Sequence, residues 1–376
     1  WFSELADQGR LDKPAGPDAD VLETFVSQHG LDSALRRFRN REMMRIVWRE
    51  LNRRASLEQS LSDLSVLADL CLQAATRHHG SHLISRYGQP RNEEGEAQEL
   101  VIIAMGKMGG RDLNLSSDID IVFTFPEQGQ CDGSRRLANE QFFTRLARSI
   151  VKSLSEITED GFCFREETRL RPFGESGPLV CSFGAMEQYY QREGRDWERY
   201  ALVKARPVAG NIDAGNELLS RLTPFVYRRY IDFGAVEALH DMYASLRSDS
   251  ARHDRAMDIK RGPGGIREIE FLVQTFQLLR GGREHSLQTN SLRDALEAVE
   301  SLSLLTTEVT RTLWRDYEFL RRLENAIQAL HDQQTHSLPQ GQDLERVARA
   351  TGFERVDELL SSLDATRTSV LDQIEA

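Results

Sequence analysis

The spacing of hydrophobic residues changes along the 376-residue chain and predicts three regions. Between residues 17 and 87, apolar side chains recur every three or four positions, which is typical of helices that bury one face. A clear example is the set Leu61, Leu64, Leu67 and Leu70. The polar stretch over residues 88–98 contains Gly and Pro and predicts a loop or a boundary.

In the second region the period shortens, which indicates strands. Residues 100–105 form a short apolar run of the kind found in a buried strand. Residues 118–125 alternate between apolar and other side chains, so Asp118 and Asp120 should lie on one face and the Ile and Phe residues on the other. Residues 162–170 alternate in the same way, and residues 141–157 between these strands predict a helix.

The third region is helical again from about residue 211. One apolar stripe follows the helix-breaking segment 262–265, and a second consists of Val309, Leu313, Tyr317, Leu320, Leu323, Ile327 and Leu330. We therefore expect an α+β protein with an N-terminal helical region (1–95), a mixed core (96–210) and a C-terminal helical bundle (211–376).

Charge and cysteine content narrow the partners and the location. The 59 acidic residues exceed the 48 basic ones, giving a net charge of −11. This balance predicts no nucleic-acid partner, because phosphate backbones are bound by clustered Lys and Arg. The longest apolar run is too short to span a bilayer, so we expect no membrane partner. The four scattered cysteines show no CxxC spacing and predict a reduced, cytoplasmic protein. A first residue other than Met suggests a fragment of a longer chain.

The strongest chemical motif is GKMGGRDLNLSSDID over residues 106–120. A glycine-rich turn follows the first strand, and Asp118 and Asp120 open the next strand on one face, about 7 Å apart at Cα by strand geometry. Two such carboxylates suit a Mg²⁺ ion, which also takes phosphate oxygens and water. The flanking groups can bind phosphate, and they are Gly109, Gly110, Ser116, Ser117 and Lys107. These are the parts for metal-assisted nucleotidyl transfer.

A second charged cluster lies within residues 165–178. Glu167 could supply a third carboxylate to the metal, with Arg169 and Arg171 beside the phosphates. The alternative interpretation is a ladder of salt bridges between strands, in which each pair contributes little stability.

Four motifs in order then show a family resemblance. These motifs are GKMGGRDLNLSSDIDIVF, RLRPFGESGPLV, GRDWERYALVKAR and GPGGIREIEFLVQTFQLLRGGR. With them, the chain resembles the glutamine synthetase adenylyltransferase family over about residues 31–340. The resemblance implies a polymerase-β-type nucleotidyltransferase core embedded in helices. It also implies that Asp118, Asp120 and Glu167 hold Mg²⁺ (or Mn²⁺).

Members of that family add AMP to a tyrosine of glutamine synthetase and also remove it. Three segments are similar to the half of these enzymes that removes AMP, and they are GESGPLV, GRDWERYA and GGIREIEF. This similarity implies phosphorolysis, in which phosphate enters and ADP leaves. The implied partners are adenylylated glutamine synthetase, phosphate, ADP or ATP, the PII signalling protein, and the C-terminal adenylylating domain of the full-length chain.

One departure from the family pattern affects the site. Where the family has the pattern VDMRLRP, this chain has EETRLRP, so Glu167 stands in place of Asp. The added methylene moves the carboxylate by roughly 1 Å, and a misplacement of that size can cost about 10²-fold in rate. This departure leaves open a regulatory module that binds nucleotide without catalysis. ATP-dependent adenylylation by the same fold is a separate alternative that also stays open.

Overall fold

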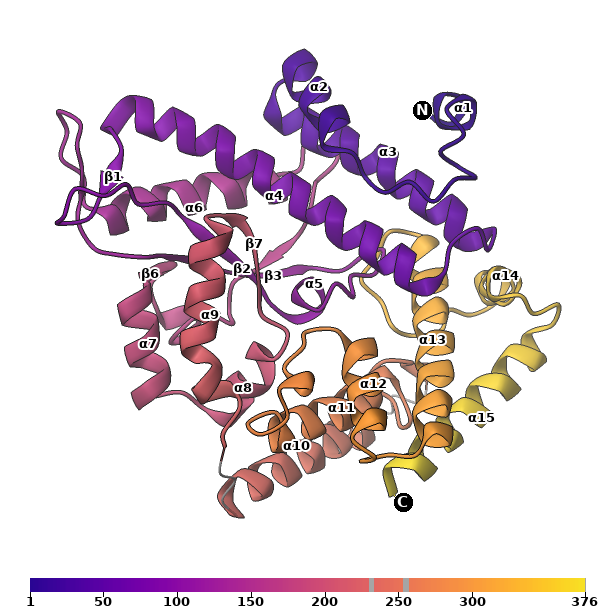
Figure 1. The fold of residues 1–376 in the computed structure, drawn as a ribbon. Helices are drawn as coiled ribbons and strands as arrows, with labels where there is room; N and C mark the ends of the chain where they lie inside the picture. Colours follow the sequence, from indigo (N-terminus) through magenta and orange to yellow (C-terminus); the bar gives the residue numbers. More distant parts are fainter. Residues whose placement is uncertain (230–232, 253–256, 376) are drawn as a thin grey trace. The chain divides into compact units, whose positions relative to one another are not determined.

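The computed structural model describes residues 1–229, 233–252 and 257–375. Within them, helices predominate, and the strands form a five-stranded sheet and a two-stranded sheet (Figure 1). The predicted α+β class is therefore confirmed. The chain divides into two compact units that are each described separately. Unit 1 consists of Trp1–Ile46, Ser62–Leu113 and Ser117–Phe225, and unit 2 of Val47–Leu61, Asn114–Ser116 and Val226–Ala376.

The five-stranded sheet belongs to unit 1. Its strands are β2 (Val101–Ala104), β3 (Ile119–Phe125), β5 (Glu166–Glu167), β6 (Val180–Ser182) and β7 (Arg206–Gly210). The order is β5-β3-β2-β7, and β6 also pairs with β3. β2 is antiparallel to both of its neighbours, whereas β5 and β6 run parallel to β3. The central strand β2 is buried along its whole length, as its apolar run predicts.

Unit 1 also contains helices, some of which pack against the sheet. Those that begin in unit 1 are α1 (Phe2–Asp7), α2 (Ala19–His29), α3 (Leu31–Leu51), α5 (Gly106–Gly109), α6 (Asn139–Ser155), α7 (Phe183–Arg192), α8 (Asp196–Leu202) and α9 (Ile212–Val226). α4 (Leu57–Tyr87) enters unit 1 from Ser62 onward and lies beside α6, where His79 Nε2 and Ser153 Oγ are 2.8 Å apart (Figure 1). The helix predicted over residues 141–157 is α6.

Two local predictions differ from the structure. The strand predicted over residues 162–170 is reduced to the two residues of β5, because the chain leaves the sheet after Glu167 and turns into a loop. Within the predicted loop over residues 88–98, β1 (Pro90–Arg91) pairs with β4 (Gln130–Cys131) as a separate two-stranded sheet.

Unit 2 is a helical bundle. It contains α10 (Phe233–Arg252), α11 (Ile266–Arg280), α12 (Leu292–Ser301), α13 (Thr307–Ala329), α14 (Gln342–Thr351) and α15 (Val356–Glu375). The predicted stripe on α13 forms the centre of its core, with Leu313, Tyr317, Leu320, Leu323 and Ile327 buried. α11 begins directly after the predicted helix-breaking segment.

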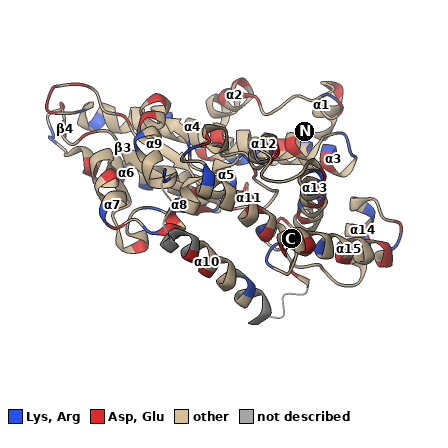
Figure 2. Ribbon diagram, turned by 60° about the horizontal axis from the view of Figure 1, so that its bottom comes forward, with Lys and Arg blue, Asp and Glu red and all other residues tan. Residues whose placement is uncertain are grey.

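Two further features concern the hydropathy and the charge of the described residues. No helix among them combines the length and the apolar character that a membrane span requires. Basic and acidic residues alternate along the helices and loops and are not segregated by sign (Figure 2).

Candidate active site

Asp118 and Asp120 lie at the start of β3, in unit 1. Both are partly buried, whereas Ile119 and Ile121 between and after them are fully buried. The predicted alternation of the two faces is therefore confirmed at this end of the strand. Further along, Val122 and Thr124 are buried as well, so only the start of β3 has a polar face open to solvent.

The glycine-rich turn packs directly against Asp120. The backbone N–H of Met105 donates to the carbonyl of Asp120 at 2.8 Å. Gly106 has a φ of +53°, and a Cβ at this position would lie 2.5 Å from Oδ2 of Asp120. Both the backbone conformation and the space therefore require glycine here, and the absent side chain leaves the carboxylate of Asp120 against the turn.

The other end of the turn is held by β7 and the chain before it. A Cβ on Gly109 would lie only 1.9 Å from the carbonyl oxygen of Lys204. Arg206 donates to the carbonyls of Met108 and Gly109 and forms a two-pronged ion pair with Asp69, at 2.8 and 3.1 Å. The turn is thus fixed by a partly buried Arg–carboxylate pair, a connection between distant segments that no local sequence pattern indicates.

Glu167 lies on the strand next to Asp120. In the parallel pairing of β3 with β5, Asp120 is the direct partner of Glu167. Side chains at paired positions point to the same face of a sheet, so the two carboxylates share one face. Arg169 binds both oxygens of Glu167, through its backbone N–H at 3.0 Å and through its guanidinium. The guanidinium bond lowers the pKa of Glu167 below its usual value.

A second arginine binds the neighbouring aspartate. Nε of Arg165 donates to Oδ1 of Asp118 at 2.7 Å. Sequence reasoning missed this residue, although it alternates with Glu167 and Arg169 on the same segment. Glu166 lies between Arg165 and Glu167 in the sequence, and burial raises the pKa of its carboxyl. Asp118 and Glu167 are thus each bound by an arginine.

Arg171 has a different environment from Arg169. Its guanidinium donates to the carbonyls of Thr168, Glu175 and Gly177, and so closes the loop that follows β5. Its three nitrogens are engaged with this loop, whereas the sequence suggested contact with phosphate. Arg169 is much more exposed, with 65% of its side chain accessible.

The remaining predicted residues fall in two places. Lys107 lies in α5 and Ser117 immediately before Asp118, both partly buried, and Gly110 ends the turn. Ser116 belongs to unit 2, where its backbone N–H donates to Oε1 of Gln328 at 2.8 Å.

The three carboxylates have the chemistry of a metal site but are not gathered into one. Asp118, Asp120 and Glu167 offer only oxygen donors, the type that Mg²⁺ prefers. In the arrangement described, no three His, Cys, Asp or Glu side chains within residues 1–229, 233–252 and 257–375 come together closely enough to hold a metal ion. Arg169 binds both oxygens of Glu167 and would therefore compete with a metal ion for this carboxylate.

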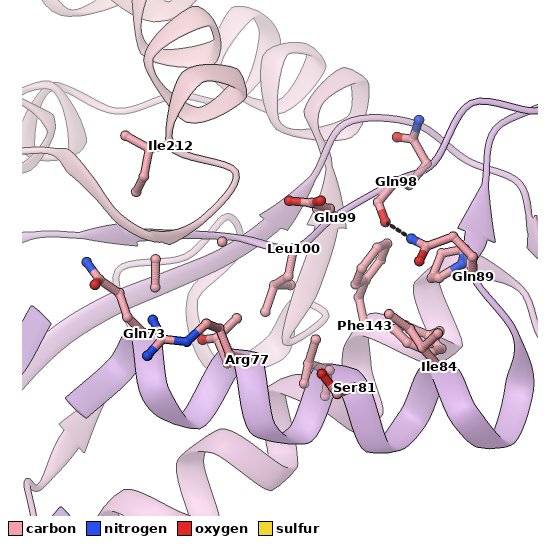
Figure 3. Close-up of a pocket in the computed structure, with 17 residues that line it drawn as sticks. Gln73, Arg77, Ser81, Ile84, Gln89, Gln98, Glu99, Leu100, Phe143 and Ile212 are labelled. Atoms are coloured by element: carbon pink, nitrogen blue, oxygen red, sulfur yellow. Dashed lines mark hydrogen bonds between the residues drawn. The ribbon is translucent and has the colours of Figure 1, made fainter. Parts of the chain in front are cut away.

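A cavity of about 560 Å³ lies elsewhere in unit 1. Its lining comes from α4, α6, the residues before β2 and the end of β7, and includes Arg77, Glu99, Leu100 and Phe143 (Figure 3). Leu100 precedes β2, whereas the glycine-rich turn follows it, so the cavity and the carboxylates lie at opposite ends of this strand.

Comparison with known proteins finds several similar proteins that share one name. The chain is 49% identical over 337 residues to the bifunctional glutamine synthetase adenylyltransferase/adenylyl-removing enzyme of Xanthomonas campestris pv. campestris, which covers 89% of this chain and 36% of the relative. Enzymes of the same name from Thioalkalivibrio sulfidiphilus and Pseudomonas aeruginosa are 46% and 48% identical over 359 residues, or 93% of this chain and 37% of each relative. The chain thus spans little more than a third of these relatives.

Two family models match successive parts of the chain. Residues 240–375, in unit 2, match the model for GlnD PII-uridylyltransferase. Residues 2–221, which include the carboxylates and the glycine-rich turn, match the model for glutamate-ammonia ligase adenylyltransferase. The chain belongs to the glutamate-ammonia ligase adenylyltransferase family.

Proposed function

We propose that this chain carries an adenylyl-removing centre, which removes the adenylyl group from adenylylated glutamine synthetase by phosphorolysis and releases it as ADP. The observation that carries the proposal is the group formed by Asp118, Asp120 and Glu167 beside the glycine-rich turn. The names of the relatives, which include both adenylyl transfer and removal, support it. The GESGPLV and GRDWERYA motifs favour removal over transfer.

The reaction exchanges one phosphorus–oxygen bond for another. An oxygen of inorganic phosphate bonds to the phosphorus of tyrosyl-AMP, and the bond from phosphorus to the tyrosyl oxygen breaks. The electron pair stays on the tyrosyl oxygen, which takes a proton from solvent, and ADP leaves. Because the nucleophile is already anionic, charge neutralisation and alignment contribute more than base catalysis.

The residues of the site divide this work. Bound Mg²⁺ or Mn²⁺, held by Asp118, Asp120 and Glu167, would neutralise negative charge on the reacting phosphates. The exposed guanidinium of Arg169 attracts the incoming phosphate, and its exchange from Glu167 to phosphate frees that carboxylate. The glycine-rich turn, which contains Lys107, lets the backbone approach the nucleotide, and Ser117 directly before Asp118 can donate to a phosphate oxygen.

The partners follow from the same proposal. The substrate is adenylylated glutamine synthetase, and the chain works in the cytoplasm as part of a longer protein that also holds an adenylylating domain and responds to PII. ATP-dependent adenylylation is the competing activity, since the relatives' names include both.

A product assay separates the two activities. The protein is mixed with adenylylated glutamine synthetase, Mg²⁺ and phosphate, and the released nucleotide is identified. We expect ADP that requires phosphate and that is lost in Asp120→Asn but kept in Asp132→Asn, a matched change beside the separate strand β4. Labelling of unmodified glutamine synthetase from ATP, without ADP release, would show the reverse activity.

A further inference from the structure

A buried glutamine in unit 2 binds the segment Asn114–Ser116. Oε1 of Gln328, on α13, accepts hydrogen bonds from Nδ2 of Asn114 at 2.6 Å and from the backbone N–H of Ser116 at 2.8 Å. Gln328 is 0% exposed, Asn114 3% and Ser116 2%. A buried backbone N–H is stabilised by an acceptor, so this oxygen stabilises the segment in the position that it has here.

The orientation of the Gln328 amide is set by its partners. Both groups that face Oε1 are donors, so only the carbonyl side of the amide can point toward them. On the opposite side, Nε2 faces the carbonyl of Thr335 at 3.4 Å. One side chain of α13 therefore holds a side chain and a backbone group of the segment at the same time.

We infer that Gln328 is a positioning residue for the candidate active site. Ser116 is followed by Ser117 and Asp118, so a restraint on the backbone of Ser116 limits where the first carboxylate can lie. A displacement of about 1 Å at a reacting group can lower the rate about 10²-fold. The inference rests on the proposed function in one respect, that Asp118 acts in the reaction.

Three variants of the protein test this role. Gln328→Met keeps the length of the side chain and removes the acceptor, whereas Gln328→Glu keeps acceptor oxygens. The matched control is Gln277→Met, which alters another buried glutamine, on α11, that donates to the carbonyls of Leu287 and Thr289. We expect Gln328→Met to lower kcat about 10- to 100-fold with KM for adenylylated glutamine synthetase changed less than about threefold.

The controls separate positioning from loss of stability. Gln328→Glu should recover at least about tenfold in kcat relative to Gln328→Met, because the acceptor returns. Gln277→Met should lower the melting temperature while leaving kcat unchanged. An equal loss of kcat in Gln328→Met and Gln277→Met would overturn the inference.

A second readout does not depend on activity. Hydrogen exchange measured by mass spectrometry on a peptide covering residues 114–118 should show exchange at Ser116 at least about tenfold faster in Gln328→Met, and unchanged in Gln277→Met. Calorimetry should show about tenfold weaker binding of ADP in the presence of Mg²⁺. Unchanged exchange or unchanged ADP affinity would overturn the inference. If the wild-type protein releases no ADP from glutamine synthetase, the proposed function fails, and these two measurements still decide the role of Gln328.

Discussion

Asp120 and Glu167 are direct partners in the parallel pairing of β3 and β5. This register places a carboxylate from the segment after α6 on the same face as the Asp118–Asp120 pair. It gives structural support to Glu167 as the third carboxylate, although Arg169 now binds both of its oxygens. The register also makes the length of the side chain at position 167 a testable quantity.

We expect Glu167→Asp to retain or raise phosphorolytic activity, and Glu167→Gln to lower it at least about tenfold. The shorter Asp restores the side-chain length of the family pattern, whereas Gln keeps the length of Glu and removes the charge that a metal ligand needs. The rate of ADP release at saturating Mg²⁺ measures both. A clear loss in Glu167→Asp would exclude this residue as the third ligand.

Arg169 and Arg171 should respond differently to truncation. Arg169→Ala removes an exposed guanidinium, so we expect the apparent phosphate requirement to rise about tenfold while the melting temperature hardly changes. Phosphate titration of the initial rate gives the first quantity and thermal unfolding the second.

Arg171→Ala is the companion variant. It removes the guanidinium bonds to the carbonyls of Thr168, Glu175 and Gly177, and we expect a loss of about 1–3 kcal/mol in the free energy of unfolding. Its phosphate requirement should change less than that of Arg169→Ala. The opposite result, a selective phosphate effect at Arg171, would place that side chain in the phosphate pocket.

The sequence predicted the parts of the fold that depend on local periodicity. β2, β3, α6, α11 and the buried stripe of α13 all follow from the spacing of apolar residues, because each element buries one face or both. The carboxylates of Asp118 and Asp120 were found for the same reason, since a strand that alternates places them together on one face.

Contacts between distant segments could not be predicted in this way. The ion pair of Arg206 with Asp69 joins residues 137 positions apart, and the hydrogen bond that Asn114 donates to Gln328 spans 214 positions. On α3, Arg45 is fully buried because Glu42 and Asp63 bind its guanidinium. A buried arginine has the same local sequence signal as an exposed one, so its position depends on partners that only the fold brings near.

Glycine at position 109 is required by space, and a matched glycine tests this. A Cβ on Gly109 would collide with the carbonyl of Lys204, so Gly109→Ala must displace backbone. We expect it to lower the free energy of unfolding by about 1–3 kcal/mol and the rate of ADP release at least about tenfold. At Gly184, in α7, an added Cβ would have no atom within 4 Å.

Gly184→Ala should therefore raise the free energy of unfolding by about 0.5–1 kcal/mol, because alanine favours the helix, and leave the rate unchanged. Urea unfolding of the two variants in parallel provides the comparison. Equal stability of Gly109→Ala and the wild-type protein would show that the turn has room for a side chain.

Cys181 should make stability fall at alkaline pH. Burial raises the pKa of its thiol from the ordinary value of 9.0 to about 12. Between these two values the unfolded chain releases the proton and the folded protein keeps it, so the free energy of unfolding decreases as pH rises above about 9, by at most about 1.4 kcal/mol per pH unit. Below pH 9 both states hold the proton and this contribution does not change.

Cys181→Ala removes the thiol, so its urea-unfolding free energy should fall less steeply between pH 9 and 11 than that of the wild-type protein, whatever the difference between the two at pH 7. Parallel slopes over this range would mean that the thiol reaches solvent in the folded protein.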